Sequence, residues 1–191
     1  MGIGGNMKVR EIIRKCAVLL DDKKLSDSIN SGECTAQQQE TIDLLLECMQ
    51  LVNSRIAGDY LLLKDIKNIK TSTDILSLSK ITNNNLYKVI KVKKNGYPIS
   101  FRVMSGCLYA QSGNLEIEYA YLPEVVSIED SIDYYSGKIS ERIFAYAIVS
   151  EYLSIKGNID EAELWENKFR KAISFSLAKH KEIVIQPRRC S

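Results

Sequence analysis

The chain has 191 residues, of which 45% are hydrophobic and 26% are charged, and its formal net charge is +2. These values are typical of a globular protein with one core, or with one core and a small appendage. They exclude a chain that coats nucleic acid through its overall charge. The longest apolar stretch, 143–155, is too short to cross a membrane.

The five cysteines are widely spaced and form no Cys-x-x-Cys pair. This pattern argues against a disulfide framework and against a zinc knuckle, and a reducing cytoplasm is the expected setting. Cys16 and Cys48 fall among apolar positions, so we expect them to be core residues. Residues 1–8 lack the apolar core of a signal peptide.

Helical periodicity dominates the first 58 residues. Apolar positions predict a first helix over about 8–20, and the polar segment 25–34 is predicted to be a loop. Thr35 and Gln38 form a candidate capping box at the start of a second helix, which Gly58 is placed to end.

The period changes after this helix, and residues 59–125 are predicted to be rich in β-structure. We expect strands over 60–63, 75–78, 86–93, 97–103, 107–110 and 115–122, with irregular structure in the rest of 68–79. Asn95-Gly96 is a dipeptide that accepts positive φ at both central positions of a type I′ hairpin turn. Pro98 cannot donate to a sheet ladder, so its strand is expected to lie at an edge or to pair only beyond this residue.

Helical patterns return near the C-terminus. Ser127 and Asp130 form a second candidate capping box, predicted to open a short helix to about Tyr135. Two longer helices are expected over 140–156 and 160–181. Their short connection at Gly157-Asn158 tolerates the left-handed conformation of a helix stop, so the two helices should pack antiparallel. The inner face of the last helix is predicted to consist of Trp165, Phe169, Ala172, Ile173 and Ser176, with Leu164 and Leu177 beside it.

The predicted class is therefore α+β: a four-helix unit, made of two N-terminal and two C-terminal helices, with an inserted antiparallel β-rich subdomain. The expected divisions are the N-terminal helices over 1–58, the β-rich insertion over 59–125, the C-terminal helices over 126–182 and an extended tail over 183–191.

The tail combines an apolar run, a proline and two arginines: Ile183, Val184, Ile185, Gln186, Pro187, Arg188 and Arg189. An extended peptide of this kind can add to the sheet edge of a partner or fill a groove, with the arginines paired to carboxylates or phosphates. A disordered terminus is the alternative.

No arrangement of residues predicts catalysis. The only histidine, His180, lies between lysines at a predicted helix end, where a surface position explains it. The acidic residues Glu116, Glu118, Glu124, Glu129, Asp130 and Asp133 leave open a small metal-dependent hydrolase, although a solvated strand face and the first turn of a helix also explain them. The basic residues Lys168, Arg170, Lys171 and Lys179 leave open a DNA-binding regulator.

Three segments carry a resemblance when they are taken in order. The first is 53–61, Asn-Ser-Arg-Ile-Ala-Gly-Asp-Tyr-Leu, and the second is 117–123, Ile-Glu-Tyr-Ala-Tyr-Leu-Pro. The third runs through Ser140-Glu141-Arg142, Glu151-Tyr152-Leu153, Gly157, Glu161-Ala162, Trp165, Phe169 and Ala172 to the terminal Pro187-Arg188-Arg189. With these segments the chain resembles the head–tail connector (adaptor) proteins of tailed bacteriophages, including their tail-tubular-protein-A-like branch. Members often end in an aromatic residue after the two arginines, a place that Cys190 takes here.

The resemblance implies a structural virion protein, neither an enzyme nor a holder of a cofactor or metal. Members form a homo-oligomeric ring, commonly of twelve copies, at the head–tail junction beneath the portal protein, and double-stranded DNA passes through it. The ring is assembled in the cytoplasm of the bacterial host, with no membrane involved.

The resemblance further implies that the helical part makes the ring and docks on the portal, while the β part faces tail or neck proteins. By position, Ile183 to Arg189 would bind the portal, and the Asn95-Gly96 hairpin would be a tail-side loop.

Overall fold

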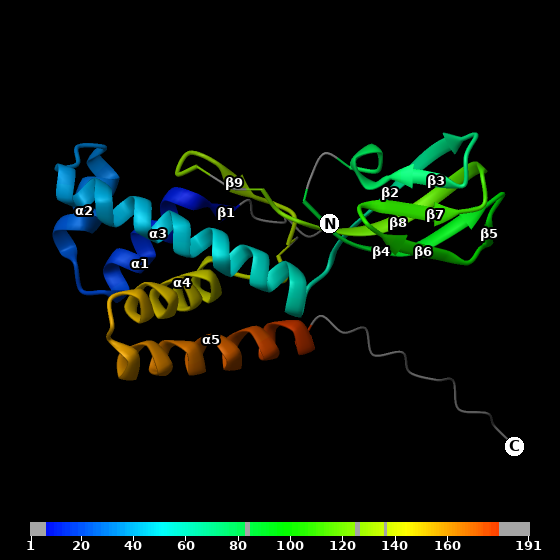
Figure 1. The fold of residues 1–191 in the computed structure, drawn as a ribbon. Coiled ribbons are helices and arrows are strands. Elements are labelled where there is room, and N and C mark those ends of the chain that lie inside the picture. Colours follow the sequence, from blue (N-terminus) through cyan, green and yellow to red (C-terminus); the bar gives the residue numbers. More distant parts are fainter. Residues whose placement is uncertain (1–6, 83–84, 125–126, 136, 180–191) are drawn as a thin grey trace, which may run out of the picture. The chain divides into compact units, whose positions relative to one another are not determined.

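The computed structural model describes residues 7–82, 85–124, 127–135 and 137–179, and these residues form five α-helices and three antiparallel sheets (Figure 1). The class is α+β, as the sequence predicted. The chain divides into two compact units. We call residues 1–49 with 126–191 the helical unit, and residues 50–125 the β unit.

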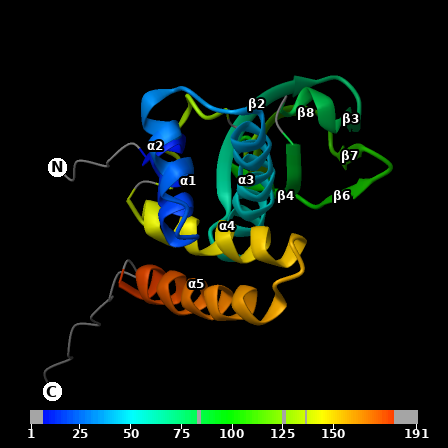
Figure 2. The same ribbon diagram turned by 90° about the vertical axis from the view of Figure 1, so that its left-hand side faces the viewer.

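The helical unit is built on α1 (Val9–Leu19), α2 (Lys23–Ser31), the first part of α3 (Ala36–Arg55), α4 (Glu141–Ile155) and α5 (Ile159–Lys179). A two-stranded antiparallel sheet, β1 (Met7–Lys8) with β9 (Ser131–Ile132), completes it. Helix α4 packs against both α1 and α5, and α5 lies at the edge of the helical unit in both views (Figures 1 and 2). Fully buried side chains from four helices form its core: Ile12, Ile13, Leu45, Met49, Phe144, Ile148, Phe169 and Ile173.

The loop predicted over 25–34 is wrong, because most of it belongs to α2. The Asp22 carboxylate caps this helix by accepting a hydrogen bond of 2.9 Å from the Leu25 amide. Leu25 and Ile29, one turn apart, are both buried. Gly32 then ends the helix with φ of 77°. The two buried side chains on one face stabilise a helix whose other positions are polar.

The capping box predicted at the start of α3 is confirmed. The Gln38 side-chain oxygen accepts a hydrogen bond of 2.9 Å from the Thr35 amide, and the Gln38 amide donates to the Thr35 hydroxyl at 3.3 Å. After Arg55 the helix widens into a π-helical turn, Ile56–Tyr60.

The short helix predicted over 127–135 is also wrong. The Ser127 amide does donate to the Asp130 carboxylate, at 2.8 Å, but this bond closes a turn and no helix follows. The chain enters β9 instead, held by pairing with β1 and by a hydrogen bond of 3.0 Å from the Val9 amide to the Asp130 carbonyl oxygen. Tyr135 is then fully buried, with its ring centroid 5.6 Å from that of Phe144.

The β unit consists of two antiparallel sheets that share one core. The four-stranded sheet has the order β2-β8-β4-β5, from β2 (Leu63–Thr71), β8 (Gly113–Leu122), β4 (Asn85–Lys94) and β5 (Tyr97–Pro98). The three-stranded sheet has the order β3-β7-β6, from β3 (Ile75–Ser77), β7 (Cys107–Ala110) and β6 (Phe101–Met104). A 3₁₀ turn, Leu78–Lys80, follows β3. Both sheets contribute to the core, which consists of Leu76, Ile81, Val92, Leu108, Ala110, Leu115, Ile117 and Tyr119.

Two strand predictions in this unit need correction. Strand β2 starts at Leu63 and includes residues 68–71, which were expected to be irregular, while most of the predicted strand 60–63 lies outside β-structure. The predicted return strand 97–103 divides between the sheets: β5 stays beside β4, and β6 joins the other sheet. Pro98 lies in the edge strand β5, as expected, and the next donor is the Ile99 amide, which bonds to the Val92 carbonyl at 3.0 Å.

Strand β4 contains two irregularities opposite β8. Its pairing register shifts between Leu86 and Lys88, and again between Val89 and Lys91. Such bulges place an extra residue on one strand and change which of its side chains share a face. The imperfect alternation of 86–93 in the sequence is explained by these shifts.

Candidate interaction surfaces

The Asn95-Gly96 turn, expected to be a tail-side loop, closes the β4–β5 hairpin. Asn95 has φ of 53° and Gly96 has φ of 83°, as a type I′ turn requires, and Lys94 pairs with Tyr97 across it. Tyr97 is 76% exposed. The turn therefore presents a large aromatic side chain at the end of the four-stranded sheet.

A hollow of about 460 Å³ lies beside this turn. Side chains from three strands line it, among them Asn68, Lys70, Lys93, Asn114 and Glu116. Its polar groups are mostly amides and amines, which can donate hydrogen bonds to a ligand, and they lie beside the apolar Ile69 and Leu115.

Lysines gather on the face of the four-stranded sheet that points away from the core. The register places three β4 lysines opposite alternate β8 residues, with Lys88 opposite Ala120, Lys91 opposite Glu118 and Lys93 opposite Glu116. Two lysines of β2 occupy the same face on the other side of β8. We call this surface the lysine face, made of Lys64, Lys70, Lys88, Lys91 and Lys93.

The acidic residues considered for metal binding do not come together. Glu116 forms an ion pair of 2.5 Å with Lys93, and Glu118 one of 3.1 Å with Lys64. In the helical unit, Glu129 pairs with Arg10, and Asp130 accepts the turn hydrogen bond described above. Across the described residues, no three His, Cys, Asp or Glu side chains are grouped so as to hold a metal ion.

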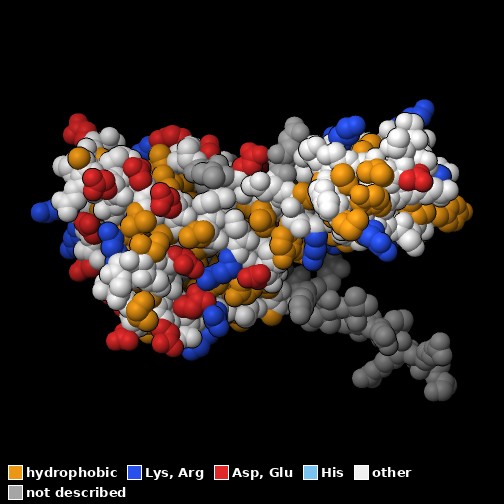
Figure 3. All heavy atoms as spheres, viewed as in Figure 1, with side chains coloured by type: hydrophobic (Ala, Val, Ile, Leu, Met, Phe, Trp, Pro, Cys, Tyr) orange, Lys and Arg blue, Asp and Glu red, His pale blue; other side chains and the backbone are white. Residues whose placement is uncertain are grey.

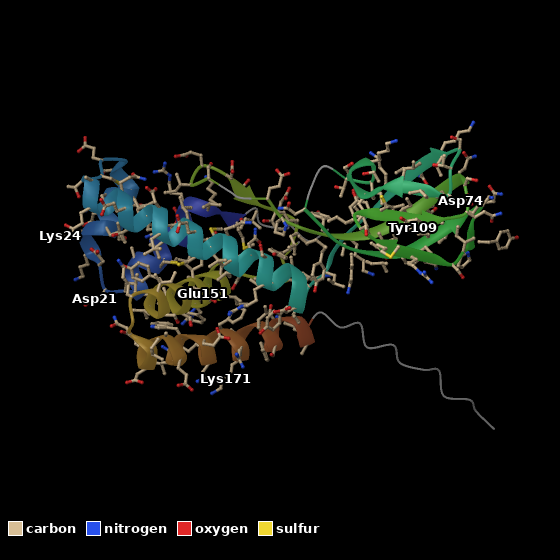
Figure 4. All side chains as sticks on the ribbon, viewed as in Figure 1. Asp21, Lys24, Asp74, Tyr109, Glu151 and Lys171 are labelled. Carbon is tan, nitrogen blue, oxygen red and sulfur yellow. The ribbon has the colours of Figure 1, made fainter. Side chains whose placement is uncertain are left out.

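The outer face of the three-stranded sheet is partly apolar. Ile75 and Met104 are 53% and 52% exposed, and Tyr109, opposite Ile75 in the register, lies half-buried between their strands. Figure 4 labels Tyr109 together with Asp74, the residue before β3. The Asp74 carboxylate accepts a hydrogen bond of 2.7 Å from the Ser112 amide, which lowers the pKa of Asp74. Hydrophobic side chains are visible over the strands of this unit in Figure 3.

The α4–α5 pair carries the second apolar surface. Phe169 and Ile173 face inward and are fully buried, as predicted, whereas Phe175 on the same helix is 75% exposed. Trp165 is half-buried, with its ring centroid 5.5 Å from that of Tyr146.

A groove of about 470 Å³ runs between the two helices. We call it the α4–α5 groove; its lining includes Arg142, Ile143, Tyr146, Ala172, Phe175 and Lys179. The groove thus combines aromatic side chains with two basic groups.

The basic residues proposed for DNA binding on the last helix do not form one free patch. Arg170 forms an ion pair of 2.7 Å with Glu166, and the Lys168 ammonium lies 3.7 Å from the centroid of the Trp165 ring. Lys171 and Lys179 are exposed, and Figure 4 shows Lys171 on the side of α5 away from α4. His180 and the predicted portal-binding residues, Ile183 to Arg189, lie outside the described residues.

Cys16 and Cys48 are core residues, as predicted, and both are fully buried. Burial raises the pKa of the Cys16 thiol far above its usual range, and it raises the pKa of Cys48 to about 11. Cys34 is exposed, and Cys107 is half-buried on the outer face of β7. Because buried thiols with raised pKa are inert, the two core cysteines serve packing rather than chemistry.

No family model matches the chain, and no curated protein matches it significantly. Within the described residues, none of the helices combines the length and apolar character needed to cross a membrane.

Sequence reasoning missed the lysine face and the exposed position of Phe175. The lysines at 64, 70, 88, 91 and 93 come from two segments about 20 residues apart, and neither segment alternates cleanly enough to show its solvent side. The sequence did carry one signal, the excess of basic residues in this part of the chain: residues 50–125 contain ten Lys and Arg but six Asp and Glu.

Proposed function

We propose that this chain is a structural head–tail connector of a tailed bacteriophage, without enzymatic activity. It forms a homo-oligomeric ring at the head–tail junction of the virion, twelve copies by resemblance, between the portal protein and the tail or neck proteins. Double-stranded DNA passes through this ring during genome delivery. The proposal rests on the resemblance of three ordered sequence segments and on the surfaces that the two units present.

One observation carries the interaction role: the α4–α5 pair exposes large apolar side chains that its own core does not use. Ile155, Ile159, Leu164 and Phe175 are each exposed by more than half. Phe175 also lines the α4–α5 groove, and exposed aromatic side chains beside a groove suit protein association. Repeated by symmetry, many modest contacts close a ring without any single strong site.

The β unit supplies a second set of contacts in this proposal. The Asn95-Gly96 turn with exposed Tyr97 would meet the tail-side partner, together with the apolar face around Ile75 and Met104. Exposed aromatic residues are enriched where proteins bind one another. The segment from Ile183 to Arg189 would dock on the portal.

Deletion of residues 183–191 tests the proposal. We expect the truncated chain to keep the circular dichroism spectrum and melting temperature of the full chain, but to fail to bind portal rings in co-sedimentation. Gene order identifies which portal to use, because a portal and a major capsid gene should lie upstream and tail genes downstream. Unfolding on truncation would make the tail part of the core, and portal binding by the truncated chain would contradict its docking role.

Two measurements separate this proposal from its rivals. A hydrolase predicts a shift of melting temperature on adding a divalent metal ion, lost on replacing Glu116 and Glu118; a connector predicts none. A DNA-binding regulator predicts that the free subunit binds duplex DNA at physiological salt, which a conduit for passing DNA should not do.

A further inference from the structure

The lysine face differs in kind from the other exposed surfaces of the β unit. The lysine face holds five lysines and two glutamates. Among its described residues, Ile66 is the one large hydrophobic side chain that is exposed by more than half. Protein–protein interfaces are depleted in lysine and enriched in aromatic residues. The composition of this face therefore favours an anionic ligand over a protein partner.

The two glutamates leave a positive surplus on this face. Their carboxylates are engaged by Lys93 and Lys64, at 2.5 and 3.1 Å. In the portion of the chain that the structure describes, Lys70, Lys88 and Lys91 form no ion pair, and all three are exposed. Like charges on one sheet face repel each other, so a bound polyanion would relieve an unfavourable feature of the fold.

The spacing of these lysines matches a ligand with repeated charges. Residues two apart along a strand are about 7 Å apart, and strands β2 and β4, on either side of β8, are about 10 Å apart. Duplex DNA carries one negative charge per roughly 3.4 Å of axis on each strand, so such lysines reach different phosphates. A lysine binds phosphate as a flexible point charge, which needs no fixed geometry.

Two amide side chains lie among the lysines at the hairpin end of the face. Asn68 lies opposite Glu116 and Asn114 lies opposite Lys70, and both line the hollow beside the Asn95-Gly96 turn. Amide side chains are common donors to phosphate oxygens. Lys70 and Lys93 line the same hollow, so amide and ammonium donors lie together there.

We infer that the lysine face binds the phosphate backbone of duplex DNA, weakly and without reading its sequence. The inference goes beyond the connector proposal and stands on the register of β2, β8 and β4. The three lysines without an ion pair predict a slope of about −2.7 for the logarithm of affinity against that of salt concentration. The affinity should therefore fall about 200-fold between 20 and 150 mM NaCl.

Fluorescence anisotropy of a labelled 24-base-pair duplex with the full chain tests this inference. We expect binding at 20 mM NaCl that is lost in the triple variant Lys70→Gln, Lys88→Gln, Lys91→Gln. The matched control replaces three exposed lysines of the helical unit, Lys24, Lys171 and Lys179, by glutamine. It removes the same charge and should keep the affinity within about twofold and the salt slope unchanged.

Three results would overturn the inference: no binding at 20 mM NaCl, equal losses in the two triple variants, or competition by poly-L-glutamate as strong as that by unlabelled duplex. The last result would assign the face to an acidic protein. Binding that disappears in the sheet variant but stays strong at 150 mM NaCl would contradict the predicted weak, salt-sensitive binding and would also count against the connector. Failure of portal docking would not bear on the DNA result. Docking is tested by deleting residues 183–191, whereas DNA binding is tested by substituting lysines of the β unit.

Discussion

The Ser150 hydroxyl on α4 donates a hydrogen bond of 2.8 Å to the carbonyl oxygen of Ala162 on α5, and both residues are buried. This bond ties together the two antiparallel helices that line the α4–α5 groove. It lies close to Gly157, whose φ of 82° ends α4.

Replacement of Ser150 by alanine should lower the free energy of unfolding by about 1 kcal/mol, the usual worth of one buried hydrogen bond. Ser154→Ala is the matched control, because this exposed residue donates its hydroxyl hydrogen bond to the Ser150 carbonyl within the same helix. Urea denaturation should show an effect below about 0.5 kcal/mol for the control. Equal effects would mean that the interhelical bond contributes nothing of its own.

Two phenylalanines of α5 offer a sharper contrast. Phe169 is fully buried, so Phe169→Ala should lower the free energy of unfolding by about 3–5 kcal/mol, through lost burial and a remaining cavity. Phe175 is 75% exposed, so Phe175→Ala should lower the free energy of unfolding by less than about 0.5 kcal/mol.

The Phe175→Ala variant also tests the α4–α5 surface as a ring contact. Sedimentation velocity should show weaker self-association for this variant than for the parent chain at the same concentration, with the melting temperature unchanged. Unaltered association would place the ring contacts elsewhere on the molecule.

Gly96→Ala should destabilise the protein by about 1–2 kcal/mol, because alanine is strained at φ of 83° although no neighbouring atom obstructs its side chain. Gly58 provides the control: its backbone is not left-handed, and its nearest neighbour, the Tyr87 ring, is 3.9 Å from an added methyl group. Gly58→Ala should be neutral or stabilising by up to about 1 kcal/mol. Thermal denaturation followed by circular dichroism should give a lower melting temperature for Gly96→Ala than for Gly58→Ala. The reverse order would refute the turn assignment.

Stability should fall at alkaline pH because of the core cysteines. The folded protein holds the Cys48 proton up to about pH 11, whereas the ordinary pKa of the thiol is 9.0. The protonated Cys48 thiol therefore contributes its full stabilisation below about pH 9. Between about pH 9 and pH 11 the free energy of unfolding declines, by at most about 1.4 kcal/mol per pH unit for this thiol. Cys16, raised in the same direction, adds to the decline.

Urea denaturation from pH 8 to pH 10 measures this decline. The Cys48→Ala variant should show a smaller decline than the parent chain, and Cys34→Ala, which removes an exposed thiol, should show the same decline as the parent. A decline equal in all three proteins would assign the alkaline sensitivity to other groups.

Features that depend on local sequence could be predicted. The Thr35–Gln38 box, the Asn95-Gly96 turn and the Gly157 corner each rely on residues within about four positions of one another. Their physical causes, side-chain caps and left-handed backbone, are contained in those few residues.

Features that depend on distant pairing could not be predicted. Ser131 and Ile132 looked helical because the strand that pairs with them, Met7–Lys8, is more than 120 residues away. Helix α2 was a different failure, since its Asp22 cap and its Leu25 and Ile29 pair were present in the sequence but outweighed by polar neighbours.

The two bulges of β4 have a consequence for how this protein tolerates change. Tyr87 and Ile90 have no register partner on β8, and they bring three unevenly spaced lysines to one side of the sheet. Loss or gain of a single residue at either bulge would reverse the parity of one end of the strand, turning lysines inward and valines outward. Single-residue insertions and deletions in this strand should therefore be tolerated far less well than substitutions that keep its length.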